Sequence, residues 1–162
     1  MTRYISRPLR TMFEEFSDKS VSAIHAAEAL AEQLEDQSVA TGHLIYGLTV
    51  DSSVSLHHIF NDLNVDPDMF SEYVGSLPRE PEVTRGAPFN RHCMTVFDRA
   101  RELAKDLGSK IVNPEHIAVA ILSIKSGSCY ETLKEFSIEP SYVTMLIMES
   151  LGFEEDQAPD WF

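Results

Sequence analysis

The residues of this chain best suited to chemistry are its six histidines, and the first possibility they raise is a metal site. The best cluster that the sequence offers combines the adjacent pair His57 and His58 with His43. Successive residues of a helix point about 100° apart, so His57 and His58 could not easily bind one ion together. No metal-ligand spacing of His, Glu or Cys accompanies them. We therefore expect no metal or other cofactor, and a small metal-dependent enzyme is a disfavoured interpretation.

Two of the histidines, His43 and His116, occupy equivalent places in an internal repeat. Moving the sequence back by 73 residues aligns residues 112–117 with residues 39–44 without a gap. A symmetric pair of this kind has two interpretations. Each imidazole can satisfy a backbone group at the start of a helix, or it can contribute to a binding site. The sequence favours the structural interpretation.

Most of the chain takes part in this repeat. The two copies share identical residues and also keep apolar residues at matching positions, as expected when both present the same core face. The identical pairs are Phe16/Phe89, Ala27/Ala100, Leu30/Leu103, Ala31/Ala104, Leu34/Leu107, Val39/Val112, His43/His116, Ser53/Ser126, Ser55/Ser128 and Pro67/Pro140. Core positions are also expected for the pair Val21/Met94 and for Met69, Phe70, Tyr142 and Met145. The pattern predicts an all-α fold of two tandem four-helix repeats.

The helices of each predicted repeat can be placed from apolar spacing and from residues that begin or end helices. Long helices are expected over residues 17–34 and 91–107, the second followed by Gly108, which is favoured after a helix C-terminus. Second helices should begin near Thr41 and at Asn113-Pro114, where the Asn side chain would accept from free amides. Third and fourth helices are expected to begin at Ser53 and Ser126 and at Asp66-Pro67 and Glu139-Pro140.

The domain boundaries follow from these elements. Residues 13–77 form the first predicted repeat and residues 89–152 the second, and a chain of this size favours packing both into one domain. Residues 78–88 are rich in proline and read as a linker. Residues 1–12 are predicted to be a flexible basic tail, and residues 153–162 an acidic tail.

The composition limits the possible partners. A net charge of −13 and 13 scattered Lys and Arg residues disfavour nucleic-acid binding. No apolar run approaches the length of a membrane span, and no nucleophile motif or phosphate-binding loop indicates an enzyme. Cys93 and Cys129 align with Ser20 and Leu56, so nothing in the duplicated design is expected to need them, and a reducing compartment is the natural interpretation.

Short motifs at the predicted second helices resemble a known family. They read Ala40-Thr41-Gly42-His43-Leu44 and Asn113-Pro114-Glu115-His116-Ile117, and a phenylalanine precedes each first helix. These features resemble the Clp N-terminal domain family, whose signature is Gly-Thr-Glu-His followed by a hydrophobic residue. The resemblance covers residues 12–152. It implies two four-helix repeats related by a pseudo-twofold axis, in a domain that docks adaptors and substrates on AAA+ unfoldases of the ClpA and ClpC type.

The resemblance also implies where a protein or peptide would bind, with Thr41, His43, Glu115 and His116 as the contact residues. In ClpC-type domains the Glu of each motif helps to hold the guanidinium of phosphoarginine-marked substrates. Here only Glu115 keeps this carboxylate, because Gly42 replaces it in the first copy. Any such site is therefore expected to be one-sided, whereas a purely structural Glu115 would stabilise the N-terminus of its helix.

No Walker motif is present in the chain, so the resemblance implies a stand-alone Clp-N protein. The leading hypothesis is a non-catalytic accessory or adaptor-like module that binds a Clp ATPase, the Clp proteolytic core, an adaptor or a substrate. The alternative is a decoy or resistance protein that sequesters ligands or peptides directed at the unfoldase N-domain. A cytoplasmic location is expected, with the plastid stroma as the alternative.

Overall fold

The computed structural model describes residues 13–78 and 88–153, and this part of the chain is all helical apart from two isolated β-bridges. The predicted all-α fold of two four-helix repeats is confirmed. The helices are α2 (Asp18–Gln33), α3 (Thr41–Thr49), α4 (Ser55–Asp62) and α5 (Pro67–Ser76) in the first repeat, and α6 (Arg91–Asp106), α7 (Pro114–Leu122), α8 (Gly127–Glu135) and α9 (Pro140–Ser150) in the second. The predicted basic tail and nearly all of the predicted linker and acidic tail lie outside the described residues.

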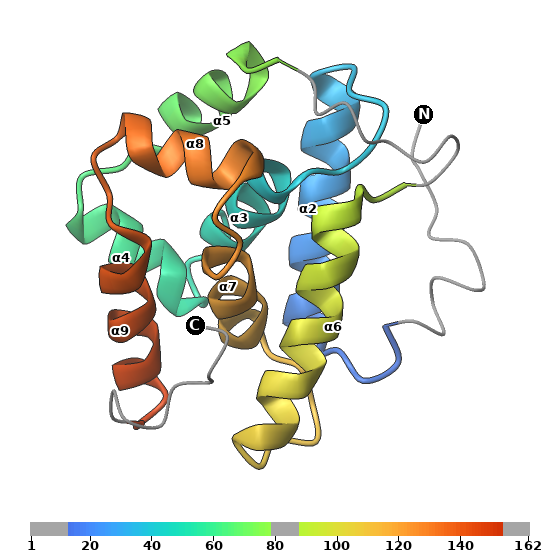
Figure 1. The fold of residues 1–162 in the computed structure, drawn as a ribbon, viewed down its shortest axis with the longest axis vertical. Coiled ribbons are helices and arrows are strands. Elements are labelled where there is room, and N and C mark those ends of the chain that lie inside the picture. Colours follow the sequence, from blue (N-terminus) through green and yellow to red (C-terminus); the bar gives the residue numbers. More distant parts are fainter. Residues whose placement is uncertain (1–12, 79–87, 154–162) are drawn as a thin grey trace.

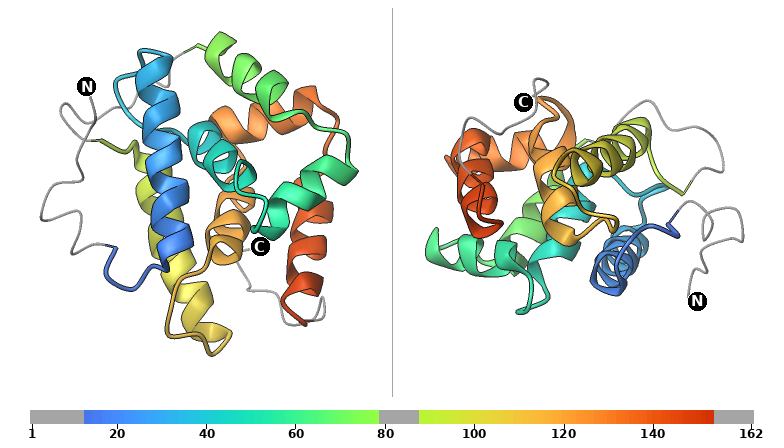
Figure 2. Two further views of the ribbon diagram at one scale, coloured as in Figure 1. Left: turned by 180° about the vertical axis from the view of Figure 1, so that it is seen from behind. Right: turned by 90° about the horizontal axis from the view of Figure 1, so that it is seen from below.

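The short helices α3 and α7 lie at the centre of the molecule (Figure 1). The long helices α2 and α6 cover one side of this central pair, and α4, α5, α8 and α9 form a layer on the other side (Figure 2). Helices from different repeats pack together within that layer, α4 against α9 and α5 against α8. The two repeats therefore share one interior, and residues of both contribute to one continuous hydrophobic core.

Several helices begin where the sequence predicts. The Ser17 hydroxyl accepts a hydrogen bond from the amide of Ser20 at 3.1 Å, which caps α2, and the side chain of Asn90 caps α6 in the same way at 3.0 Å. Helices α5 and α9 begin with Pro67 and Pro140, because proline presets the backbone for a first helical turn.

Three of the predicted caps differ in detail from the prediction. Helix α4 has Val54 rather than Ser53 at its N-cap, because Ser53 instead bonds the Asp51 carboxylate through both its amide and its hydroxyl. Asn113 is the N-cap residue of α7, but its side chain makes no capping hydrogen bond. Ser126 stands at the predicted N-cap of α8, also without a capping bond.

Each repeat is tied to the other by the segment that leads into its first helix. Phe16, ahead of α2, forms a parallel β-bridge with Val112, ahead of α7, while Phe89, ahead of α6, pairs with Val39, ahead of α3. The amide of Val112 donates to the Glu15 carbonyl at 2.7 Å, and the Val39 amide donates to the corresponding Pro88 carbonyl at 2.8 Å. This exchange supplies a physical reason why the two repeats form one unit.

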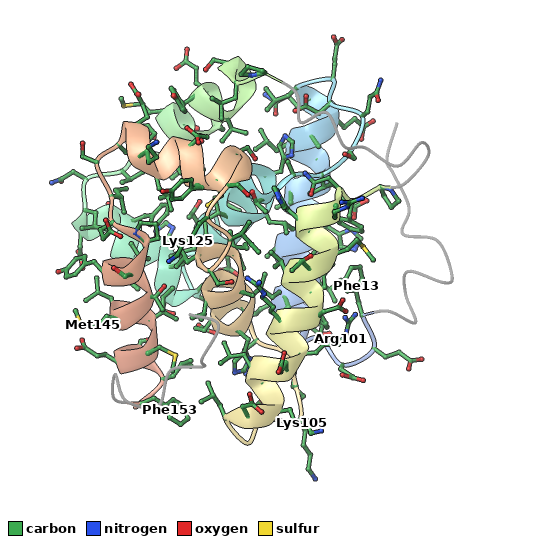
Figure 3. The ribbon with its side chains drawn as sticks, viewed as in Figure 1. Phe13, Arg101, Lys105, Lys125, Met145 and Phe153 are labelled. Carbon is green, nitrogen blue, oxygen red and sulfur yellow. The ribbon has the colours of Figure 1, made fainter. Side chains whose placement is uncertain are left out.

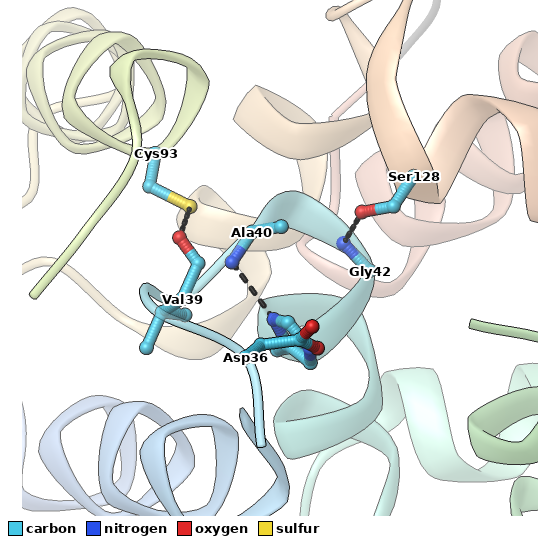
Figure 4. A network of polar contacts seen from close by, with 7 residues as sticks. Asp36, Val39, Ala40, Gly42, Cys93 and Ser128 are labelled. Atoms are coloured by element: carbon cyan, nitrogen blue, oxygen red, sulfur yellow. Dashed lines mark hydrogen bonds and ion pairs between the residues drawn. The ribbon is translucent and has the colours of Figure 1, made fainter. Parts of the chain in front are cut away.

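The same exchange gives Cys93 a structural partner, which corrects the expectation that the duplicated design does not need it. The Ser20 hydroxyl donates to the Val112 carbonyl at 2.7 Å. Cys93, the equivalent of Ser20, donates its thiol to the Val39 carbonyl at 3.2 Å (Figure 4). Serine and cysteine thus perform the same task in the two repeats, each binding a carbonyl of the other repeat.

Aromatic side chains fill the space between the two lead-in segments. The ring of Phe13 meets the rings of Phe16 and Phe97 edge-on, with centroids 5.0 Å apart in each pair, and contacts Phe89 at 5.8 Å. Arg101 of α6, which lies on this side of the molecule with Phe13, places its guanidinium 5.3 Å from the centre of the Phe16 ring (Figure 3). The predicted first repeat therefore begins with a residue that packs against the second.

Three residues expected in the core are exposed instead. Met94 is 42% exposed, Met69 56% and Tyr142 48%. Each of them directly follows or precedes a buried neighbour, Cys93, Phe70 or Val143 respectively. Adjacent helical residues point about 100° apart, so the buried neighbour defines the core stripe and these three side chains fall outside it.

The other residues expected in the core are buried to different degrees. Val21 and Met145 are only partly buried, whereas Phe70 is buried as predicted. Glu28 is a buried residue of α2 that the apolar pattern did not anticipate.

Within the described residues, no helix is both long enough and apolar enough to cross a membrane.

Candidate functional site

The candidate binding residues lie at the N-termini of the two central helices. Thr41 and His43 belong to the first turn of α3, and Glu115 and His116 to the first turn of α7. Each of these helix ends meets the start of a helix from the other repeat, α8 or α4 respectively. The structure thus brings the four residues to two equivalent junctions between the repeats, with two residues at each.

Both imidazoles are buried and bind the backbone. Nδ1 of His43 accepts a hydrogen bond from the amide of Ala40 at 2.8 Å (Figure 4). Nδ1 of His116 accepts from the amide of Asn113 at 2.9 Å. In each case the bonded amide belongs to the residue that precedes the helix, where intrahelical partners are missing. The prediction that each histidine satisfies a backbone group at a helix start is confirmed.

The two imidazoles differ in what surrounds the rest of the ring, beyond the Nδ1 atom that binds the backbone. Because Nδ1 of His43 accepts, the ring proton is assigned to Nε2, which donates to the Asp36 carboxylate at 2.8 Å. The residue equivalent to Asp36 in the second repeat is Ser109, which has no carboxylate. At His116, burial lowers the pKa below its ordinary value, and the adjacent Glu115 carboxylate opposes part of that shift. His116 is therefore held as a neutral acceptor near pH 7.

Thr41 is fully buried and serves the junction between α3 and α8. Its hydroxyl accepts a hydrogen bond from the amide of Cys129 at 3.2 Å. Burial of Cys129 raises the pKa of its thiol, so this cysteine stays protonated. A peptide on the surface could not reach Thr41 without opening the junction, and the same holds for the buried His43 and His116.

Glu115 is the one candidate residue that is partly exposed, and its surroundings mirror those of Gly42. The Ser55 hydroxyl donates to the Glu115 carboxylate at 2.9 Å, across the junction between α4 and α7. At the other junction the Gly42 amide donates to the hydroxyl of Ser128, the equivalent of Ser55, at 2.8 Å (Figure 4). The junction between α4 and α7 therefore presents the Glu115 carboxylate. The junction between α3 and α8 has no carboxylate at the matching position, where the Gly42 amide bonds Ser128 instead.

The packing around Gly42 explains why the first junction has no carboxylate. A Cβ atom at this position would lie 2.8 Å from the Ser128 hydroxyl oxygen and 3.0 Å from a methyl group of Val74. Real Cβ atoms essentially never approach another atom as closely as 2.8 Å, so even alanine would require the Ser128 side chain to shift. The difference between the two motifs is thus built into the packing of the repeats.

Sequence reasoning missed three residues of these junctions: Asp36, Ser55 and Ser128. Ser55 and Ser128 form one of the identical pairs of the repeat, so their identity at the 73-residue offset was a usable signal. Asp36 has no counterpart of its type in the other copy. Its contact with His43 spans a loop and could not be read from helical spacing.

The histidine cluster considered for a metal has other partners. His57 bonds the Thr49 carbonyl at 2.6 Å and His58 bonds the Ser52 carbonyl at 2.8 Å, both through ring nitrogens. Their rings meet edge-on with centroids 5.2 Å apart. In residues 13–78 and 88–153, no group of three or more His, Cys, Asp or Glu residues is arranged to hold a metal ion.

The fold and the two junctions define a class of protein: all-helical double-repeat domains in which the central helix of each repeat, α3 or α7, begins in the same way, with a histidine bonded to the preceding amide. Comparison with protein families identifies the class more closely. The family model of the Clp repeat (R) N-terminal domain matches residues 15–136 of the sequence. The chain belongs to this family. The resemblance seen in the two short motifs is thereby confirmed.

Curated relatives are Clp chaperones of much greater length. Chaperone protein ClpD1, chloroplastic, from Oryza sativa subsp. japonica is 25% identical over 158 residues, which cover 90% of this chain and 16% of the relative. Chaperone protein ClpB from Bacteroides thetaiotaomicron is 27% identical over 116 residues, which cover 70% of this chain and 14% of the relative. The chain thus spans about one sixth of the length of these relatives.

Solved structures of the same fold are N-terminal domains. The N-terminal domain of ClpD from Arabidopsis thaliana superimposes with a TM-score of 0.73 at 24% identity, covering 86% of this chain and 96% of that domain. The Hsp104 N-terminal domain from Candida albicans gives a TM-score of 0.69 at 16% identity, covering 90% and 100%. At these identities the likeness establishes the fold.

Proposed function

We propose that this chain is a non-catalytic protein-binding module of the Clp system, which docks on a Clp ATPase, the Clp proteolytic core, an adaptor or a substrate. The observation that carries the proposal is the family match over residues 15–136. Its relatives named above are Clp chaperones, and the matching segment is a small part of each. A module of this kind works by presenting a surface to another protein.

The internal bonding of the junctions supports binding rather than catalysis. Thr41, His43 and His116 are buried and already bonded within the domain: Thr41 bonds the other repeat, and each histidine bonds the backbone at the start of its own helix. Glu115 is the candidate contact residue, because it is the partly exposed residue of the four and lies at the start of α7. A guanidinium group of a partner would pair with this carboxylate.

The location of the protein is part of the same proposal. A cytoplasmic site suits two buried cysteines that are not joined by a disulfide, and the plastid stroma is the alternative that the chloroplastic ClpD relatives support. Fluorescence microscopy of the chain fused to a fluorescent protein distinguishes the two compartments.

Affinity purification from the source cell tests the binding function. The full chain carrying a tag is crosslinked in cells, purified at low salt and analysed by mass spectrometry. Recovery of a Clp ATPase, a Clp protease subunit or an adaptor is the expected result. A Glu115→Lys variant should recover less of the partner than a Glu102→Lys control on the exposed side of α6. Recovery of none of these proteins would contradict the proposal.

A further inference from the structure

The layer of α4, α5, α8 and α9 carries large apolar side chains on its surface at equivalent places in the two repeats. Met69 and Tyr142 are separated by the repeat offset, and both lie in the first turn of a helix, α5 or α9. They are 56% and 48% exposed. The segments that join α4 to α5 and α8 to α9 lie on the same side of the molecule, away from α2 and α6 (Figures 1 and 2).

Aromatic and apolar groups continue this surface. Tyr73 of α5 meets Phe136 edge-on at 6.2 Å, and both side chains are partly exposed. Met145 lies on the outer side of α9 (Figure 3). An open hollow of about 290 Å³ lies where α8 passes into α9, and it is lined by Tyr130, Lys134, Ser137, Ile138, Glu139 and Pro140. The layer thus offers both exposed apolar side chains and a recess.

The charge of the same layer is almost entirely negative. Residues 55–78 and 126–153 contain a single Lys or Arg, Lys134, against the exposed carboxylates Asp62, Asp66, Asp68, Glu72, Glu131, Glu135, Glu139 and Glu149. Partial desolvation, together with the nearby carboxylates of Glu135 and Glu131, raises the pKa of Tyr73. Much of the net charge of −13 therefore lies in the layer that carries the exposed apolar side chains.

We propose that the layer formed by α4, α5, α8 and α9 is a docking surface for a basic amphipathic segment of a partner protein. Apolar side chains of the segment would cover Met69 and Tyr142 and enter the recess, while its Lys and Arg residues would face the surrounding carboxylates. A second copy of this acidic chain would bring like charges together and fits the surface poorly. The inference rests on the proposed binding function, to which it adds a face and the chemistry of the partner.

The test uses the full chain and a fluorescent synthetic peptide in which Lys and Leu residues form the two faces of a helix. Fluorescence anisotropy gives its dissociation constant. Met69→Ser combined with Tyr142→Ser should weaken binding about tenfold, as expected for central anchors. Glu72→Lys combined with Glu131→Lys should also weaken it at low salt, and the effect should shrink at high salt because the charges are exposed. Circular dichroism checks that each variant is folded.

The controls are a Met94→Ser variant and a Glu102→Lys variant, which change an exposed Met and an exposed carboxylate on α6. Both should bind the peptide as the parent does. The same peptide with Glu in place of Lys should not bind measurably. Equal weakening by the control variants, or equal binding of the acidic peptide, would overturn the inference.

Sedimentation and affinity purification separate this inference from the wider proposal. Self-association that the Met69→Ser and Tyr142→Ser changes abolish would assign the layer to a second copy of the chain and overturn a basic partner. If a Clp protein is recovered equally by the parent and by these variants, the binding function stands and the docking surface is wrong. If the peptide result holds but no Clp protein is recovered, the surface stands and the assignment to the Clp system fails.

Discussion

The carboxylate of Glu115 accepts a hydrogen bond at 2.9 Å from the hydroxyl of Ser55, which belongs to the other repeat. This bond makes Glu115 both a surface group and part of the contact between α4 and α7. The equivalent position at the other junction is Gly42, whose amide instead donates to Ser128. The two repeats therefore present different chemistry at matching places.

Binding of a guanidinium-containing ligand should be confined to the second repeat. In an NMR titration with phosphoarginine or an Arg-rich peptide, we expect the amide signals of residues 113–117 to shift and those of residues 40–44 to stay unchanged. The reason is that Glu115 offers a carboxylate and Gly42 does not. Equal shifts at both junctions would contradict this prediction.

A Glu115→Gln variant separates a ligand role from a structural one. Glutamine keeps an oxygen that can accept from Ser55 but loses the charge that favours a helix N-terminus, so stability should fall by about 0.3–1 kcal/mol. Urea unfolding measures this loss. If the variant loses stability but binds the ligand unchanged, Glu115 has only a structural role.

Replacing Gly47 by alanine should strongly destabilise the contact between α2 and α3. A Cβ atom there would lie 2.2 Å from the carbonyl oxygen of Ala23, and a backbone atom cannot easily move away. We expect a loss of about 3 kcal/mol in the free energy of unfolding, measured with urea. Gly75→Ala is the matched control, since its Cβ would meet only the end of the Leu34 side chain. A similar loss in both variants would contradict the packing explanation.

His116 should make the domain less stable in weak acid. Its pKa is lowered in the folded state, so between this value and the unfolded pKa of about 6.5 the unfolded chain binds more protons than the folded one. Stability should therefore decline as the pH falls through about 6.5, and the decline from this group should end below its folded pKa. Urea unfolding over this pH range measures the slope.

The control for this prediction is a His116→Gln variant. Glutamine at the third helical position can also accept from the amide of Asn113 but does not titrate, so the variant should show a shallower pH dependence than the parent. An unchanged slope would mean that other groups cause the acid sensitivity.

Cys93 should be replaceable by serine but less readily by a side chain without a donor. Serine would keep the hydrogen bond to the Val39 carbonyl, as Ser20 does to Val112, so its effect should stay within about 1 kcal/mol. Cys93→Val should cost more, because it removes the donor and adds a methyl group in a fully buried place. Urea unfolding of the two variants checks the order, and equal stabilities would show that the thiol hydrogen bond contributes nothing.

The sequence by itself determined the duplicated helical plan of this protein. The 73-residue offset, the apolar spacing and the prolines at 67 and 140 are local features, and each acts within a few turns of helix. The roles of His43 and His116 could also be predicted, because each binds an amide only three residues away. Contacts of this local kind can be predicted because the residues that form them are close together in the sequence.

Only the tertiary structure decided how the two repeats combine. The pairing of Phe16 with Val112 and of Phe89 with Val39 joins residues far apart in the chain, and no periodicity within a helix encodes it. The same holds for the contact of Ser55 with Glu115 and for the steric exclusion of a side chain at Gly42. Helical spacing shows which face of a helix is apolar, but the surface that this face meets depends on long-range packing, which also left Met69 and Tyr142 in solvent.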